Sequence, residues 1–416
     1  MIRLRVTTAS VAVSLAVAIN ITVLTLLWPF TSRIRLELGL GKTIQPISDF
    51  PYQCTRIFHP LLQSCGDMWL SRGSRQLYLA CGDFRSRARW FPPAGNYNIT
   101  ARSTKDAIVV LEIDQPGLIP HFPEFGGPVT AQRLVTPGFS GTLGDGLLDL
   151  NGFTGVDMGN VVIRLLVVNN RPSVDSSTGT YAEDQATVGA NSTIEVFEHA
   201  GRGHDFLSHL LTVVSPKITT PNRPAAFGTT GFYITNDHGP VKTGKFFQLK
   251  AKLGKGDVTF CSYTDGCRVV SAGHSHPSGL AHSHGHLYVP SSASGGLRIN
   301  RSHQDGSLAK VADIDAPYAM DNLATDGNGV TWAAASPRGY RNGAYAKNPV
   351  GPVPPSTVLR IRLRPWGYEW KKMLEDRDGE VLPAASVVVY DHLVKRLFLG
   401  SAFSPFITMC YLPMEI

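Results

Sequence analysis

"HGHLYVPSS" (residues 284–292) is a turn followed by a hydrophobic strand that ends in small residues, and this order recurs further along the chain. "GNGVTWAAAS" (327–336) and "LVKRLFLGSAF" (393–403) repeat it. The three segments stand roughly 45–65 residues apart, close to the length of one four-stranded propeller blade. The recurrence therefore favours a β-propeller, and a tandem of two-sheet sandwiches is the alternative.

The rest of the chain has the same character. Short runs rich in Val, Ile, Tyr, Phe and Thr, such as "VVIRLLVVNN" (161–170) and "GFYITND" (231–237), alternate with Gly, Asn, Asp and Pro. No long segment with helical periodicity competes with them after residue 60. The 41 glycines and 28 prolines, with only 17% charged residues, agree with many turns and few helices. We therefore expect an all-β fold.

The N-terminus predicts entry into the secretory pathway. Arg3 and Arg5 precede an uncharged run over 6–32, which is long enough to span a bilayer core of about 30 Å. No convincing small-residue cleavage site follows it. We therefore expect a signal-anchor or transmembrane segment over 1–35, a linker over 36–53 and a lumenal or extracellular propeller over 54–416. A cleaved signal peptide and a secreted protein are the alternative.

Other features agree with an oxidising compartment. Sequons predict glycosylation at Asn98, Asn191 and Asn300. The six cysteines form an even set, and Cys261 and Cys267 flank a hairpin turn, which predicts a local disulfide. The net charge of +7 comes without a nucleic-acid motif or aromatic ladder, so we expect no nucleic-acid partner.

"FYITNDH" (232–238) has a strand that runs directly into an amide, a carboxylate and an imidazole. Asn and Asp are poor strand residues. One interpretation is a turn, which Asn and Asp open by bonding their own backbone. The other is a set of oxygen donors for a cation, because several blades can each deliver one ligand to a point on the propeller axis.

Four separated motifs resemble the serum paraoxonase/arylesterase family, over roughly residues 50–416. They are "LLVVNN" (165–170), "FYITNDH" (232–238), "MDNLATDGNGVTWAAASP" (320–337) and "SVVVYDHLVKRLFLGSAF" (386–403). The family comprises calcium-dependent lactonases with a six-bladed β-propeller. The resemblance implies six blades, an N-terminal hydrophobic helix and a disulfide between Cys54 and Cys410 that joins the first and last strands. Closing so long a loop stabilises the fold on the order of 5 kcal/mol.

The resemblance also implies two calcium ions on the axis. For the structural ion the matching ligands are Asp67, Asp237 and the backbone carbonyl near Val156. For the catalytic ion they are Asn236, Asp321 and Asn322, with Ser278 in place of an asparagine. The structural set keeps both carboxylates, whereas the catalytic set has Gly66 where the family has a glutamate, so its calcium affinity is expected to be lower.

The two catalytic histidines of the family are replaced by Thr154 and Asn170 in this alignment. Two other histidines are candidates for their role. His276 lies two residues before Ser278, and His238 follows the Asn–Asp pair. For each, a hydrogen bond within a loop is the alternative.

Three functions are consistent with these substitutions. Fungal relatives that resemble this family include hetero-Diels–Alderases of tropolonic sesquiterpene pathways, which join a quinone-methide diene to a terpene alkene. Such a pericyclase needs no base, because orienting two apolar partners alone contributes roughly 7–11 kcal/mol. We expect this function, with small apolar or aromatic metabolites as substrates. The alternatives are a calcium-dependent lactonase or arylesterase and a non-catalytic secreted binding propeller.

Overall fold

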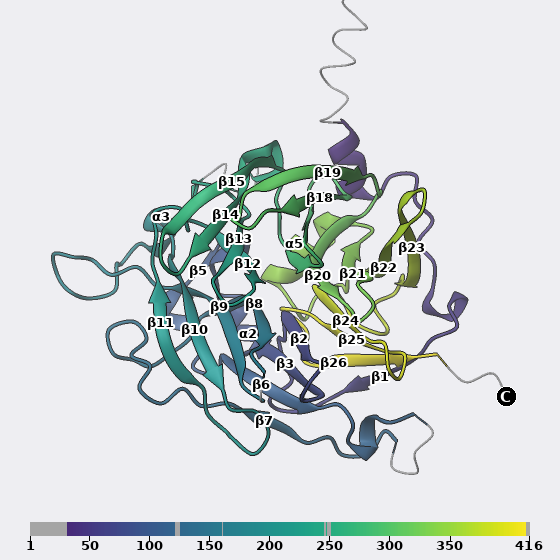
Figure 1. Cartoon of the computed structure of the whole chain (residues 1–416), viewed down its shortest axis with the longest axis horizontal. Helices are drawn as coiled ribbons and strands as arrows, with labels where there is room; N and C mark the ends of the chain where they lie inside the picture. The colour runs from purple at the N-terminus through teal and green to yellow at the C-terminus, as the bar shows by residue number, and fades with distance from the viewer. Residues whose placement is uncertain (1–30, 121–124, 160, 245–246, 248–250, 413–416) are drawn as a thin grey trace, which may run out of the picture.

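The computed structural model describes residues 31–120, 125–159, 161–244, 247 and 251–412. Its strands form six four-stranded antiparallel sheets, arranged as blades around a central axis (Figure 1). The predicted all-β, six-bladed propeller is confirmed. Of the predicted membrane segment, residues 1–30 lie outside the described residues. Among those described, no helix is long and apolar enough to cross a bilayer.

The first three blades follow one another along the chain. The first contains β2 (Asp67–Ser71), β3 (Gln76–Cys81), β6 (Ala107–Glu112) and β7 (Ala131–Arg133). The second contains β8 (Leu150–Asp157), β9 (Ile163–Arg171), β10 (Asn191–His199) and β11 (Ser208–Val213). The third contains β12 (Pro221–Phe227), β13 (Gly231–Asn236), β14 (Gly256–Ser262) and β15 (Gly266–His274).

The next two blades repeat the pattern, and the last one combines both ends of the chain. The fourth contains β16 (Ala281–Ser283), β17 (His286–Pro290), β18 (Leu297–Ser302) and β19 (Leu308–Ile314). The fifth contains β20 (Ala319–Thr325), β21 (Thr331–Ser336), β22 (Ser356–Arg364) and β23 (Gly367–Asp376). The sixth contains β24 (Val387–Asp391), β25 (Arg396–Gly400), β26 (Ile407–Tyr411) and β1 (Gln53–Ile57).

Few helices interrupt the blades. Short α-helices and single turns lie in the connections: α2 (Phe84–Arg87), α3 (Gln185–Val188), α5 (Gly339–Lys347), η1 (Ile47–Asp49), η2 (Pro92–Ala94), η3 (Ile99–Ala101), η4 (Pro116–Leu118) and η5 (Ala251–Lys255). A two-stranded sheet of β4 (Trp90–Phe91) and β5 (Asn96–Tyr97) also lies outside the blades.

The three recurrent segments of the sequence are the second strands of blades four, five and six, namely β17, β21 and β25. A second strand has a sheet neighbour on each edge and another blade against each face. Every residue of β21 and β25 is accordingly buried. This position explains why the recurrent segments are hydrophobic throughout instead of alternating, and why they predicted the fold.

The hydrophobic core lies between neighbouring blades. Leu77 and Leu79 of β3 belong to one buried cluster with Phe398 of β25 and Met409 of β26, so blades one and six share a core. The sixth blade also closes the ring through its outer edge, where β1 pairs with β26. The first and last strands of the propeller are therefore held together in one blade.

The inner strands of the blades approach one another very closely. They form a closed ring in the order β2, β8, β12, β16, β20 and β24. Of these, β2, β8, β12, β20 and β24 are labelled around the centre of Figure 1. A Cβ atom on Gly152 would lie 2.3 Å from the backbone oxygen of Asn222, and one on Gly279 would lie 2.5 Å from that of Asp321. Glycine is therefore required at these two positions because any side chain would force two blades apart.

All six cysteines are paired. Cys54 lies opposite Cys410 in the β1–β26 ladder, and the two are joined by a disulfide, as the resemblance implied. Cys261–Cys267 closes the expected hairpin. The third bond, Cys65–Cys81, settles a pairing that the sequence left open. Three disulfides are typical of a protein from an oxidising, secretory compartment.

One of the three sequons is corrected by the structure. Asn191 is exposed and Asn98 is half-buried, so both remain predictions. Asn300 lies in β18 with only 3% of its surface exposed. Glycosylation of Asn300 is therefore inconsistent with the folded propeller, because a glycan needs an amide nitrogen in solvent.

We expect removal of the ring-closing disulfide to destabilise the propeller most. The Cys54→Ser/Cys410→Ser variant opens a loop of 356 residues, whereas Cys261→Ser/Cys267→Ser opens one of 6. Chain entropy predicts losses on the order of 5 and 2 kcal/mol, respectively. Urea unfolding of both variants measures the difference, and equal losses would contradict the role assigned to ring closure.

We also expect Gly279→Ala to destabilise the protein, because its Cβ would contact the neighbouring blade. Gly343→Ala is the matched control, since its Cβ meets nothing within 4 Å and it lies inside α5. Alanine in a helix interior stabilises by roughly 0.5–1 kcal/mol relative to glycine. Thermal unfolding tests both, and a neutral Gly279→Ala would show that the blades tolerate separation.

Candidate active site at the axial cavity

Two cavities lie at opposite ends of the ring of inner strands. One, of 410 Å³, is lined by residues at or just before the starts of these strands. The other, of 310 Å³, is lined mainly by residues further along these strands and after their ends. The side chain of Arg223, near the start of β12, lines the second cavity. We call the first cavity the axial cavity. Among the predicted site residues, it is lined by Asp237, His276, Ser278, Asp321 and Asn322.

Each blade contributes a residue to the floor of the axial cavity from the start of its inner strand. In blade order these are Gly66, Asn151, Asn222, Ser278, Asp321 and Ser386. Asn151, Asn222 and Ser386 were not predicted from the sequence. The chain contains two X-Gly pairs here, Asn151-Gly152 and Thr154-Gly155, which the sequence alone does not distinguish. Asn151 of the first pair lines the axial cavity.

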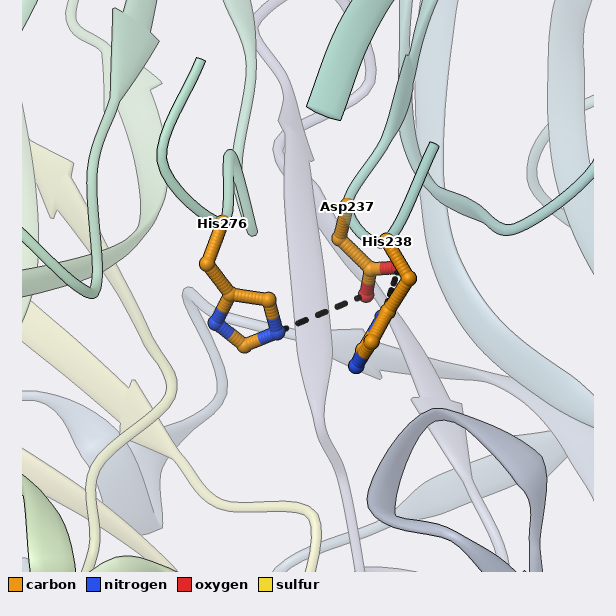
Figure 2. A group of neighbouring side chains, drawn as sticks. All are labelled: Asp237, His238 and His276. Atoms are coloured by element: carbon orange, nitrogen blue, oxygen red, sulfur yellow. Dashed lines mark hydrogen bonds and ion pairs between the residues drawn. The ribbon is translucent and has the colours of Figure 1, made fainter. Parts of the chain in front are cut away.

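Asp237, His238 and His276 form the main polar cluster of the site (Figure 2). Asp237 lies between the two imidazoles, with one carboxylate oxygen directed at each. Nδ1 of His238 is 2.5 Å from Oδ1 of Asp237, and Nε2 of His276 is 4.0 Å from Oδ2. Asp237 and His238 follow β13, whereas His276 follows β15, so the cluster depends on the packing of the third blade.

The hydrogen bonds around His276 assign its tautomer. The hydroxyl of Ser292 donates to the backbone oxygen of His276 at 3.0 Å. Its oxygen is therefore free to accept a proton from Nδ1 of His276, 2.5 Å away. The proton of the neutral ring is thus on Nδ1, and Nε2 has a free lone pair without a hydrogen-bond partner.

Burial keeps His276 neutral. Desolvation lowers the pKa of His276 to about 4, with a further contribution from His238, against the opposing charge of Asp237. His276 is also one of the few non-glycine residues with a left-handed backbone, at φ 49°. A neutral imidazole with an unoccupied nitrogen is the state that a general base requires.

Asp237 is held as a carboxylate. Burial would raise its pKa, but the charge and hydrogen bond of His238, with a bond from Asn222, hold that pKa below the usual value. Nδ2 of Asn222 donates to Oδ2 at 2.9 Å. The His238 ring stacks on Phe247 at 3.7 Å between centroids, which fixes its orientation.

Asp321 and Asn322 form the second polar group of the cavity. Burial, and then the charge of Asp67, raises the pKa of Asp321 to about 7, while a hydrogen bond from Ser278 opposes the rise. Oδ1 of Asn322 is buried without a hydrogen-bond partner, whereas its Nδ2 donates to the backbone oxygen of Gly66 at 3.3 Å. A half-buried carboxyl and an unsatisfied amide oxygen thus come from adjacent residues that both line the cavity.

One part of the cavity wall is apolar. Phe91 meets Phe403 edge-on, with 5.5 Å between the ring centroids. Small side chains surround them, namely Ala94, Ala346, Ala384 and Ala402. At another part of the lining, Glu37 forms an ion pair with Lys252 at 2.9 Å. The cavity therefore offers an apolar surface beside a polar cluster.

The arylesterase family model matches residues 174–409, more than half of the chain. This chain belongs to the arylesterase family. The match includes the Asp237–His238–His276 cluster and the Asp321–Asn322 pair of the axial cavity. It begins after Asn151 and Asn170.

Individual relatives of this arylesterase-family chain are distant. Serum paraoxonase/arylesterase 1 of Mus musculus is 26% identical over 220 residues, covering 48% of this chain and 60% of the mouse protein. The Rattus norvegicus protein of the same name is 28% identical over 180 residues, covering 42% and 48%. Among solved structures, a gluconolactonase from Xanthomonas campestris aligns with 90% of this chain and 99% of its own, at 15% identity and a TM-score of 0.45.

Membership of the arylesterase family implies calcium, and the axial set of expected ligands does not fit it. Asp67 is fully buried, and Oδ2 accepts from Nε of Arg223 at 2.8 Å and from the backbone nitrogen of Phe153 at 2.9 Å. Oδ1 accepts from the nitrogen of Met68. Asp237, the second expected carboxylate, is bonded to His238 and Asn222 instead. Three hydrogen bonds thus already occupy the carboxylate of Asp67, and one of them comes from the permanent cation of Arg223.

The expected catalytic set fits in part. Oδ1 of Asn236 accepts from the backbone nitrogens of Thr219 and Thr220, so this oxygen is already used within the third blade. A Cβ on Gly66 would meet Ala402 at 3.1 Å, so the larger side chain of the family has little room here. Ser278, Asp321 and Asn322 do line the axial cavity, and the unsatisfied oxygen of Asn322 suits a cation.

Three other expected site residues lie elsewhere. Thr154 and Val156 line the cavity at the opposite end of the inner strands, because they stand three and five residues further along β8 than Asn151. Asn170 accepts a hydrogen bond from Ser192 at 2.8 Å and lines a small pocket beside His238. Thr154 and Val156 therefore lie away from the axial cavity, so this geometry does not bring Val156 to Asp237 or Thr154 to His276. Asp237 itself, with His238 and His276, remains a candidate metal ligand.

We expect Asp321→Asn to stabilise the protein increasingly as pH rises, in the presence of a chelator. The unfolded carboxyl ionises near pH 4, whereas burial raises the native pKa to about 7, so wild-type stability falls between these values. The difference in Tm between variant and wild type is expected to grow from pH 4 to 7 and then level off. A difference independent of pH would contradict the buried, protonated state of Asp321.

Proposed function

We propose that this chain is a hydrolase that opens lactones or aryl esters in the axial cavity, with His276 as the general base. The observation that carries the proposal is the bare Nε2 of His276, 4.0 Å from Oδ2 of Asp237 and at the cavity wall. Membership of the arylesterase family supports this class of reaction. The replacement of both family histidines is then compensated by a histidine from another loop.

The distance between His276 and Asp237 suits one bridging water. Two atoms 4.0 Å apart can both lie about 2.8 Å from the same oxygen. In the proposed step Nε2 of His276 accepts a proton from this water while its oxygen forms a bond to the carbonyl carbon. Asp237 stabilises the imidazolium that results, and Ser292 keeps the ring in place through Nδ1.

Completion of the reaction returns the proton. When the tetrahedral intermediate collapses, the bond between the carbonyl carbon and the ester oxygen breaks, and the imidazolium of His276 protonates the departing oxygen. The products are a hydroxy acid from a lactone, or an acid and a phenol from an aryl ester. Ser278, Asp321 and Asn322 would hold a divalent cation, which polarises the substrate carbonyl when bound.

The apolar wall indicates the preferred substrates. The edge-on pair of Phe91 and Phe403, with the alanines around it, provides a surface for an aryl group or a hydrocarbon chain. We therefore expect hydrophobic lactones and aryl esters to be better substrates than sugar lactones, whose hydroxyl groups would lose hydrogen bonds to water on this surface.

We expect His276→Gln to lower kcat by roughly 10²–10⁴ with little change in KM, as loss of a general base does. Asp237→Asn is expected to have a similar effect. His284→Gln is the matched control, because His284 has the same φ of 49° but is exposed and outside the cavity. Hydrolysis of an aryl acetate and an alkyl-substituted δ-lactone provides the measurement.

The hydrolase proposal is contradicted if wild type hydrolyses neither substrate class, or if His276→Gln retains full kcat. Far-UV circular dichroism and Tm of the variants show whether the fold is preserved. Loss of activity in His284→Gln as well would point to a general effect of histidine replacement on folding.

A pericyclic coupling of small apolar or aromatic metabolites is the second candidate. The apolar wall favours it, because such a reaction needs two apolar partners held face to face and no base. The two candidates differ in their response to the same variants. Coupling would persist in His276→Gln and fall in Ala346→Phe, which fills the apolar side, whereas the hydrolase depends on both positions.

A further inference from the structure

The side chain of Arg223 lies at the centre of the propeller, with 3% of its surface exposed. It starts on β12 in the third blade and reaches the inner strands of three other blades. Nε donates to Oδ2 of Asp67 in the first blade at 2.8 Å. Nη1 donates to the backbone oxygens of Leu280, just before β16, at 2.9 Å and of Leu323 in β20.

The guanidinium is surrounded by oxygen atoms. Besides Asp67, Leu280 and Leu323, the backbone oxygen of Met68 lies 3.4 Å from Nη2. One carboxylate and three carbonyls are the kinds of ligand that a hard divalent cation takes in proteins. Here they are all directed at a nitrogen cation that is always protonated.

The charge at this point is balanced without a metal. Arg223 and Asp67 form a buried ion pair, and two backbone N–H groups complete the bonds of the carboxylate. A divalent ion placed among the same oxygens would face the guanidinium charge within a few ångströms, and the repulsion would be poorly screened there.

We propose that Arg223 is the built-in axial cation of this propeller, occupying the place where the structural metal of the family would be expected. The guanidinium connects blades three, one, four and five, so closure of the axis does not require calcium. The proposal concerns stability and is independent of the hydrolase activity and of any cation at Asp321.

The first experiment distinguishes calcium binding at the propeller axis from calcium binding at Asp321 in the axial cavity. Tm is measured for wild type and for Asp321→Asn, each in chelator and in calcium chloride. A metal that binds only the native state raises its Tm. We expect the Tm of Asp321→Asn to be the same in both conditions. A calcium-dependent Tm that survives in Asp321→Asn would overturn the proposal, because the ion would then bind away from the cavity carboxylate.

The second experiment removes the cation. Arg223→Ala leaves Asp67 buried without its partner, so we expect its Tm to fall by roughly 5–10 °C. Calcium chloride is expected to restore part of this loss, because the oxygen cage becomes available. Arg298→Ala is the matched control, since Arg298 forms an exposed ion pair with Asp313 at 3.1 Å and its loss changes Tm little.

Two results of the second experiment would overturn the proposal: an unchanged Tm for Arg223→Ala, or a lowered Tm that calcium does not raise. If Arg223→Ala does not fold, Arg223→Lys is used, which keeps the charge but has fewer directed donors. It is expected to be less stable than wild type and insensitive to calcium when combined with Asp321→Asn. Stability equal to wild type would overturn the proposal.

Discussion

The buried ion pair between Arg223 and Asp67 is the interaction on which the arrangement of the inner strands depends. It lies where the inner strands meet, and its hydrogen bonds connect five of the six blades, since Asp67 also accepts from the backbone nitrogen of Phe153 in β8. Removing one member of such a pair costs roughly 3–5 kcal/mol, because the other charge stays buried. The pair also lies between the two cavities, so the polar residues at one end of the strands do not share a cavity with those at the other end.

This arrangement changes the role of the residues that the family resemblance points to. Arg223 neutralises Asp67. Asp237 instead bonds His238 and faces His276. Asn236 likewise serves the backbone of Thr219 and Thr220, so it stabilises a turn. Of the two interpretations of "FYITNDH", the turn therefore applies to Asn236, while Asp237 orders a pair of imidazoles.

Three acidic groups, Asp67, Asp237 and Asp321, lie near the axial cavity, and different neighbours compensate the charge of each. Asp67 has a permanent cation, and Asp237 has hydrogen bonds from His238 and Asn222. For Asp321, burial and the charge of Asp67 outweigh the hydrogen bond from Ser278 and the charge of Arg223, so its pKa is raised. The least compensated carboxyl is thus the one beside the unsatisfied oxygen of Asn322, which makes this pair the best place in the cavity for a divalent cation.

The sequence by itself determined the propeller, because strands that are buried on both faces must be hydrophobic along their whole length and these recur once per blade. It also indicated Asp237 and His238, since polar residues directly after a hydrophobic strand stand out in one dimension, and it indicated His276 through its place two residues before Ser278. Only the tertiary structure decided which of them meet. The role of Arg223 and the burial of Asn300 were not predictable, because an arginine or asparagine in a sequence gives no sign of the oxygens or strands around it. The sequence also could not tell Asn151 from Thr154. They stand three residues apart on one inner strand, yet Asn151 lines the axial cavity and Thr154 lines the cavity at the other end.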